Sequence, residues 1–264
     1  MDIEYTYIKT GEISKLGPMK MKLQQHGLNK MIDYKLTSLK TIKLHYDSKY
    51  NRYSLFVPEE YETKENNAPI GSKIGSDPGA RKFQTCVSDT EAIKFGTNMK
   101  EKITKRLNKI DKINNDYNLS KEQKRTRSDK HYRKIENMVD DMHWKVIKYM
   151  TDNYKRIQIG VLNTQSVISN DNKSQLEDMM KRVLISMKHY EFRQRLKYKS
   201  EAKRVVYTEV DEKVTSITCT NCGNCKEKFK GEIYKCTECL SVMDRDDVGG
   251  RNMLLKNTKQ KIMC

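Results

Sequence analysis

Two pairs of cysteines constrain the fold of this chain more than any other feature of its sequence. Each pair has the C-x2-C spacing, and 13 residues separate them: Cys219 with Cys222, and Cys236 with Cys239. Two such knuckles place four thiolates tetrahedrally around zinc, and the stretch is too polar to bury these cysteines as core residues. The spacing therefore predicts a zinc ribbon over residues 215–243. Cys225 forms another C-x2-C pair with Cys222 and is an alternative to Cys219, although Gly223 suits a knuckle built on the first pair.

An acidic segment follows the ribbon directly. A zinc ion held by four thiolates has no open coordination position, so we expect the ribbon to be a fold element without chemistry of its own. Three carboxylates then precede a predicted helix with two adjacent glycines: Asp244, Asp246 and Asp247, then Gly249 and Gly250. The carboxylates alone are compatible with an ordinary acidic helix start. The glycines allow this helix to approach a neighbouring strand closely.

The charge of the chain indicates its partners. Its 264 residues include 52 Lys and Arg against 35 Asp and Glu, a net charge of +17 that is spread along the whole length. Such a field attracts polyanions, and nucleic acid is the expected one. Seven cysteines without a disulfide ladder favour a reducing compartment. Since the sequence has neither an apolar run of about 18 residues nor an apolar signal core, we expect an intracellular protein of the cytoplasm or nucleus, with no membrane partner.

Alternating apolar residues predict two groups of strands. In residues 41–57 a polar turn interrupts the alternation, as in a hairpin. After a polar linker, residues 73–96 contain three further runs, which predict an antiparallel meander with Asp77 at the end of its first strand. The sequence Asp77-Pro78-Gly79 is also typical of a turn, so at this level Asp77 is either a turn residue or a functional carboxylate.

Helical patterns occupy much of the remaining chain. Apolar residues recur at helical spacing from Ile103 to Ile113 and from Ile135 to Met150, and Ser120 with Gln123 forms a capping box before the second stretch. A basic run lies between the two stripes. It could be a solvated face, but we interpret it as a phosphate-binding surface comprising Lys121, Lys124, Arg125, Arg127, Lys130, Arg133 and Lys134.

A strand at 154–166, a helical pair at 172–200 and a strand at 204–210 come next. The second helix of the pair begins at His189, which we interpret as structural. The same helix carries four more candidate phosphate-binding residues: Arg193, Arg195, Lys197 and Lys199.

Four stretches resemble the TnpB proteins of bacterial insertion sequences and their eukaryotic and viral relatives, the Fanzor proteins, with the greater likeness to Fanzor. Residues 77–85 match the first RuvC motif D-P/x-G-x-R-x-F-x-T, residues 189–199 match H-Y-x-F-R-Q-R-L, and residues 244–252 match DRD-x-x-(small)-(small)-R-N after the ribbon at 215–239. The resemblance covers about residues 41–256. It implies an α/β fold: an RNase H-like (RuvC) domain at 71–264 with the zinc ribbon inserted, after a reduced, β-rich N-terminal segment and linker at 1–70.

The resemblance also implies a set of Mg²⁺ ligands, in which Asp77 and Asp246 correspond to two family carboxylates. The Glu that TnpB proteins carry after the second-motif strand is Gly160 here, and no Asp or Glu occurs in residues 155–169. Fanzor proteins typically show this loss with a replacement Glu before the Thr-Ser of the ribbon, which corresponds to Glu212, with Glu209 as the fallback. Val248 replaces the Asn of the family pattern, which is a second departure.

The implied activity is Mg²⁺-dependent cleavage of DNA by a two-metal mechanism, directed by a guide RNA. The N-terminal region is short for the family, so a protein partner could supply the missing recognition half. Two alternatives remain: a truncated or degenerate transposon-derived protein that binds nucleic acid without cutting it, and a zinc-ribbon transcription factor. Only the nuclease requires Asp77, Glu212 and Asp246 to cluster.

Overall fold

The computed structural model describes residues 5–9, 12–16, 43–47, 52–56, 62–165, 177–211, 215, 217–225 and 231–256. The chain divides into two compact units, one made of residues 1–44 with 55–58 and the other of residues 45–54 with 59–264. Near the N-terminus, β1 (Tyr5–Lys9) and β2 (Glu12–Leu16) form an antiparallel pair. The hairpin predicted at 41–57 is present as the two-stranded sheet of β3 (Lys43–Asp47) and β4 (Arg52–Phe56).

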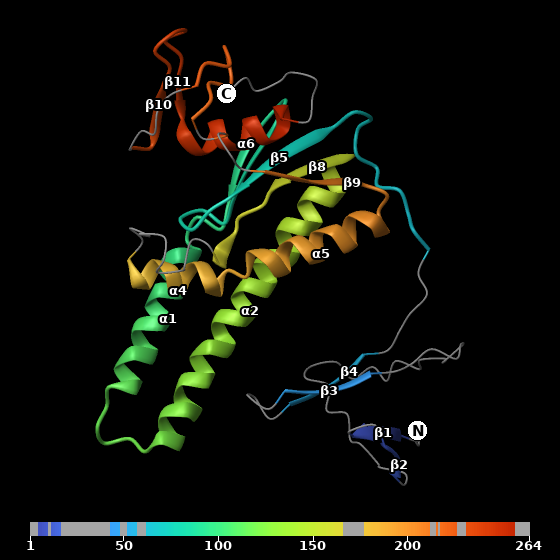
Figure 1. The fold of residues 1–264 in the computed structure, drawn as a ribbon, viewed down its shortest axis with the longest axis vertical. Helices are drawn as coiled ribbons and strands as arrows, with labels where there is room; N and C mark the ends of the chain where they lie inside the picture. The colour runs from blue at the N-terminus through green and yellow to red at the C-terminus, as the bar shows by residue number, and fades with distance from the viewer. Residues whose placement is uncertain are drawn as a thin grey trace. The chain divides into compact units, whose positions relative to one another are not determined.

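A five-stranded mixed sheet organises the second unit (Figure 1). In spatial order its strands are β7 (Ala92–Phe95), β6 (Gln84–Ser88), β5 (Lys73–Pro78), β8 (Arg156–Gly160) and β9 (Val206–Val210). The first three strands pair antiparallel, as the alternation in residues 73–96 predicted, while β8 and β9 continue the sheet in parallel from the other edge of β5. This mixed α/β arrangement, with the first strand in the centre, is the RNase H-like fold that the resemblance implied.

Among the described residues, four helices cover one face of this sheet: α1 (Met99–Asn114), α2 (Lys121–Asn153), α4 (Asp178–Ser186) and α5 (His189–Ala202). Their apolar stripes join Ile74, Ile157 and Ile159 of the sheet in one buried core. The predicted capping box at the start of α2 is confirmed, because the Ser120 hydroxyl accepts from the Gln123 amide and the Gln123 side chain accepts from the Ser120 amide. Within the described ranges, no helix has the length and apolar character needed to cross a bilayer.

The opposite face of the sheet carries α6 (Arg245–Leu255), which packs on β5 and β6 (Figure 1). A hairpin of β10 (Ile233–Lys235) and β11 (Val242–Asp244) leads directly into this helix. The close approach predicted from the glycines is present. A Cβ atom on Gly75 would lie 2.7 Å from the backbone nitrogen of Leu254, and one on Gly249 would lie 2.5 Å from a carboxylate oxygen of Asp77.

Candidate active site and zinc site

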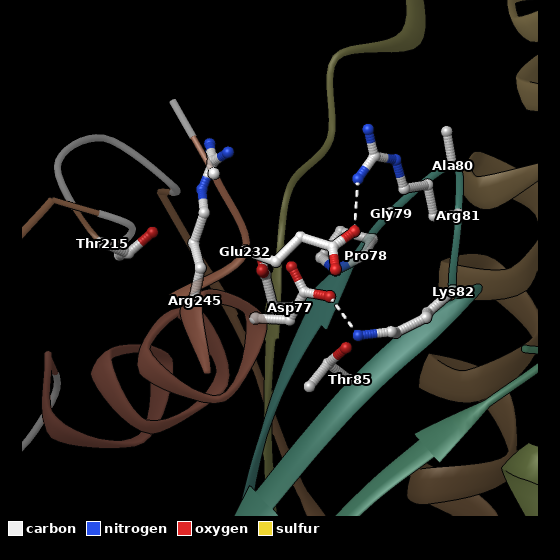
Figure 2. Close-up of a pocket in the computed structure, with 12 residues that line it drawn as sticks. Asp77, Pro78, Gly79, Ala80, Arg81, Lys82, Thr85, Thr215, Glu232 and Arg245 are labelled. Atoms are coloured by element: carbon white, nitrogen blue, oxygen red, sulfur yellow. Dashed lines mark hydrogen bonds and ion pairs between the residues drawn. The ribbon is translucent and has the colours of Figure 1, made fainter. Parts of the chain in front are cut away.

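An open pocket of about 640 Å³ lies between the end of β5 and the start of α6 (Figure 2). Asp77 and Asp246 both line it, although 169 positions separate them in the sequence. Three basic side chains, Arg81, Lys82 and Arg245, share the lining with them. The fold therefore brings two of the three predicted Mg²⁺ ligands into one cavity, beside cationic groups that suit an anionic substrate. Carboxylate oxygens are the donors that Mg²⁺ prefers, so the two aspartates fit such an ion.

The pleat of the sheet determines which side chains share the face of Asp77. Successive residues of a strand point to opposite faces. Ile74 of β5 belongs to the core beneath the helices. In contrast, a Cβ on Gly75 would contact α6, and the Asp77 side chain lies beside Gly249 of α6. Asp77 is thus a strand residue on the α6 face, and the turn begins after it. This placement favours the functional reading of Asp77 over the turn reading.

Gly160 lies at the position where a further carboxylate would have been expected. Ser76 of β5 pairs with Ile159 of β8 in a parallel ladder. Asp77 and Gly160 are the next residues of these two adjacent strands. Because Ile159 points into the helical core, Gly160 is on the α6 face, beside Asp77. A carboxylate at position 160 would therefore share the α6 face with Asp77, and Gly160 supplies none.

Glu212 lies outside the described residues, and its role stays a prediction. Glu209, the fallback, is described. It is two residues after Tyr207, which packs against the helical core, and the Tyr207 hydroxyl donates to its carboxylate over 2.8 Å. Glu209 also lies 3.5 Å from Nε of Arg193 in α5. Glu209 therefore faces the helical side of the sheet, away from Asp77, and this position argues against it as the substitute ligand.

The three carboxylates at the start of α6 have different partners. Asp244 is the N-cap of α6, and its side chain accepts hydrogen bonds from the backbone amides of Asp246 and Asp247. Asp244 therefore has the role of an ordinary acidic residue at a helix start. Lys94 reaches across from β7, with its Nζ 2.7 Å from Asp244 and 3.0 Å from Asp247. Burial favours the neutral amine of Lys94, but its hydrogen bonds to Asp244 and Asp247 outweigh burial and raise its pKa. Asp246 pairs instead with Lys82, over 2.6 Å.

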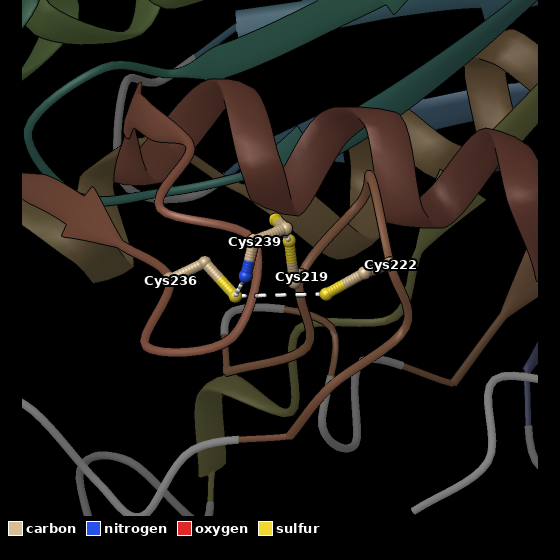
Figure 3. A group of neighbouring side chains, drawn as sticks. All are labelled: Cys219, Cys222, Cys236 and Cys239. Atoms are coloured by element: carbon tan, nitrogen blue, oxygen red, sulfur yellow. Dashed lines mark hydrogen bonds between the residues drawn. The ribbon is translucent and has the colours of Figure 1, made fainter.

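The four predicted zinc ligands converge in the ribbon (Figure 3). Their sulfur atoms all lie within 4.8 Å of one another, and the Cys219–Cys239 and Cys222–Cys236 sulfur pairs are each 3.6 Å apart. Zinc–sulfur bonds of about 2.3 Å in a tetrahedron require sulfur atoms separated by about 3.8 Å, so the cluster has the size of a zinc site. Hydrogen bonds from Ser241 lower the pKa of Cys239, which favours the thiolate that a metal binds. Cys225 is not a member of the four-sulfur group.

The buried amide of Asn252 joins the ribbon to α6. Its side-chain nitrogen donates to the carbonyl oxygens of Thr215 and Thr218, over 2.6 and 2.8 Å. Thr215 also lines the pocket. The ribbon therefore helps to hold the helix that carries Asp246, which is a more specific role than that of a separate fold element.

The predicted phosphate-binding residues fall into two groups. Those of the basic run lie on the N-terminal half of α2, and all except the half-buried Lys124 are exposed. In α5, Lys197 is exposed and Lys199 is half-buried, but Arg193 is nearly buried beside Glu209. Arg195 hydrogen-bonds to Asp140 and Glu191. These contacts give both arginines a structural role and argue against phosphate binding by them.

Several residues of the pocket were not expected from the sequence. Arg81 and Lys82 lie within the first RuvC-like motif, yet their partners, Glu232 and Asp246, are more than 150 positions away. Lys94, which does not line the pocket, likewise contacts a distant carboxylate, that of Asp244. The motif could have drawn attention to Arg81 and Lys82, but no local pattern predicts which carboxylate each one contacts.

The imidazole of His189, interpreted as structural, stacks on the buried ring of Phe83 with ring centroids 4.9 Å apart.

Comparisons with known proteins agree with this architecture. Residues 56–171 match a family model described as "Probable transposase", of the OrfB/IS605 type, and residues 189–253 match one described as "Cas12f1-like, TNB domain". The TnpB-like protein L79 of Acanthamoeba polyphaga mimivirus is 33% identical over 224 residues, which is 81% of this chain and 43% of that protein. The CRISPR-associated endodeoxyribonuclease Cas12f1 of Sulfoacidibacillus thermotolerans is 24% identical over 126 residues, 47% of this chain and 28% of the nuclease.

Among solved structures, a Cas12f1–sgRNA–target DNA complex aligns with a TM-score of 0.46 and 15% identity, covering 76% of this chain and 52% of that chain. This chain belongs to the TnpB family of transposon-associated proteins. It spans less than half the length of the TnpB-like protein of the mimivirus. The particular likeness to Fanzor proteins stays a prediction.

Proposed function

We propose that this chain carries the catalytic part of an RNA-guided DNA endonuclease of the TnpB type. One observation carries the proposal: Asp77 and Asp246, from opposite ends of the second unit, line the same basic pocket. A zinc-ribbon transcription factor has no need of such a pairing. The family relationship supports the same conclusion, since a relative of this chain is an endodeoxyribonuclease.

In this proposal Asp77, Asp246 and Glu212 hold two Mg²⁺ ions. When bound, such ions activate water for in-line attack on a phosphodiester and stabilise the leaving oxygen. Glu212 is assigned as the third ligand from the resemblance, because it lies just before Thr215-Ser216 in the sequence, as the replacement Glu of the Fanzor pattern does. The DNA and a guide RNA would be held by the exposed basic residues of α2 and by Lys197 and Lys199.

Cleavage assays with single substitutions test the proposal. The protein, with its co-purified RNA, is incubated with DNA in Mg²⁺ beside Asp77→Asn, Asp246→Asn and Glu212→Ala. We expect each of the three changes to abolish cleavage while nucleic-acid binding is retained, because most of the proposed phosphate contacts lie on α2 and α5, outside the pocket. Asp141→Asn is the matched control, since Asp141 is an exposed carboxylate of α2 paired with Lys145. Cleavage by Asp77→Asn at the rate of the natural protein would refute the proposal.

The position of Gly160 supports a second candidate, a degenerate relative that binds nucleic acid without cutting it. Under this alternative the natural protein is inactive, and Gly160→Glu restores a carboxylate beside Asp77. Activity that appears only in Gly160→Glu would establish the degenerate protein. If the natural protein cleaves DNA and Glu212→Ala does not, the degenerate alternative is excluded.

A further inference from the structure

Lys82 lines the pocket and contacts Asp246, the carboxylate that would bind a metal ion. Its Nζ lies 2.6 Å from Oδ2 of Asp246 and 3.9 Å from Oδ2 of Asp244, and its side chain is only 29% exposed. The next residue, Phe83, is fully buried, and its ring stacks with the imidazoles of His143 and His189. The backbone of Lys82 is therefore anchored, while its long side chain can move within the pocket.

The neighbouring lysine has a different position. Lys94 neutralises Asp244 and Asp247, and Asp244 is additionally committed to capping α6. Asp244 and Asp247 are thus engaged in structural contacts, namely the ion pairs with Lys94 and, for Asp244, the cap of α6. Asp246 is the carboxylate of the three that lines the pocket, and Lys82 is the cation that contacts it there. This division distinguishes Asp246 from its neighbours on physical grounds, independently of any motif.

We propose that Lys82 is the resident counter-ion of Asp246: a divalent ion displaces its ammonium group, which then contacts a phosphate of the bound nucleic acid. The inference rests on the proposed function, because it takes Asp246 as a metal ligand. An ammonium group and a divalent ion compete for the same carboxylate oxygen and repel each other when both are bound. Once displaced, the ammonium on its flexible four-carbon stem remains in a pocket that an anionic backbone would enter.

Competition is tested by titrating the zinc-loaded protein with Mn²⁺ and following free Mn²⁺ by electron paramagnetic resonance. We expect Lys82→Met to bind Mn²⁺ about fivefold more tightly than the natural protein, the size of effect for an ion pair of this exposure. Arg81→Met is the matched control, because Arg81 lines the same pocket but pairs with Glu232. Equal tightening in both variants, or none in Lys82→Met, would overturn the inference.

Asp246→Asn separates this inference from the proposed function. If Mn²⁺ binding survives Asp246→Asn unchanged, Asp246 is not a ligand and the proposed site itself fails. If binding depends on Asp246 but not on Lys82, the proposed site stands and the counter-ion inference fails.

The second step is tested by the salt dependence of binding to a single-stranded DNA oligonucleotide. In Ca²⁺, which occupies the carboxylates, we expect the slope of log affinity against log salt to be steeper for the natural protein than for Lys82→Met by about 0.7, the value of one phosphate contact. Without divalent ions the two slopes should agree, because Lys82 is then held by Asp246. Identical slopes in Ca²⁺, or a difference that persists without divalent ions, would contradict the phosphate contact.

Discussion

At the scale of single residues, Gly75 and Gly249 take part in the same contact between β5 and α6, yet a methyl group would act differently at each. A Cβ on Gly249 meets the carboxylate of Asp77, whereas a Cβ on Gly75 meets the backbone of α6 at Gly250 and Leu254. A side-chain carboxylate can rotate away, but a helix backbone cannot. A methyl group on Gly249 therefore displaces the carboxylate of Asp77, a proposed metal ligand, whereas one on Gly75 disturbs the packing of α6.

We predict that Gly75→Ala lowers the free energy of unfolding by about 1–3 kcal/mol, the usual cost of overpacking. Gly249→Ala should change stability less but weaken Mn²⁺ binding by about tenfold, as displacement of a supporting contact does. Urea denaturation and Mn²⁺ titration of both variants measure the two effects. Loss of stability in Gly249→Ala with normal Mn²⁺ affinity would contradict this assignment.

Two buried histidines make stability depend on pH. Burial lowers the pKa of His143 to about 4 and that of His189 to about 3. In the unfolded chain both imidazoles bind protons below about pH 6.5. The unfolded state therefore holds more protons than the folded state between about pH 6.5 and 4, and stability falls as the pH falls through this window.

His189→Phe keeps an aromatic ring against Phe83 but removes one titrating group. We expect the pH dependence of the free energy of unfolding between pH 6.5 and 4 to become shallower by up to about 1.4 kcal/mol per pH unit. Denaturant titrations at several pH values measure it. An unchanged dependence would mean that His189 has the same pKa in the folded and unfolded states.

At the scale of elements, the zinc ribbon and α6 are predicted to fold as one unit. Removal of zinc unfolds small metal sites because binding and folding are coupled. Asn252 of α6 donates to two carbonyl oxygens of the ribbon, so loss of the metal should also loosen the helix that carries Asp246.

We expect Cys236→Ser to lose its zinc and to speed amide hydrogen exchange in the ribbon and in α6. Cys225→Ser is the control and should keep one zinc per chain, because Cys225 lies outside the four-sulfur group. Zinc analysis and hydrogen exchange of the two variants provide the measurements. A full zinc content in Cys236→Ser, or its loss in Cys225→Ser, would show that a different set of cysteines binds the metal.

At the scale of the whole molecule, the net charge of +17 should appear as a strong salt dependence of nucleic-acid binding. The exposed run on α2 is the expected source. In contrast, Lys145 and Lys148 further along the same helix pair with Asp141 and Asp152.

Replacement of Arg127 and Lys130 together by Ala should reduce the slope of log affinity against log salt by about 1.4 for single-stranded DNA, about 0.7 for each contact. The double change of Lys145 and Lys148 to Ala should leave it nearly unchanged. The loss should be similar for unrelated DNA sequences, since phosphate contacts carry no base information. Equal effects of the two double changes would indicate that only total charge matters.

The local sequence determined the parts of this protein that depend on short-range spacing. The zinc cysteines, the capping box of α2 and the meander of β5 to β7 all follow from residues near one another in the chain. Such features are predictable because a knuckle, a helix cap or a strand is defined by bonds and dihedral angles within a few residues.

Only the tertiary structure decided which distant charges meet. Arg193 is buried beside Glu209 of β9, and Arg195 pairs with Asp140 of α2 and Glu191 of α5. These contacts argue against phosphate binding by the two arginines, and the sequence did not reveal them. The position of Gly160 beside Asp77, and the pairing of Lys82 with Asp246, depend on strand register and on the crossing of α6 over the sheet. Electrostatic contacts depend on distance in space, and the sequence alone does not specify distances between residues that the fold brings together.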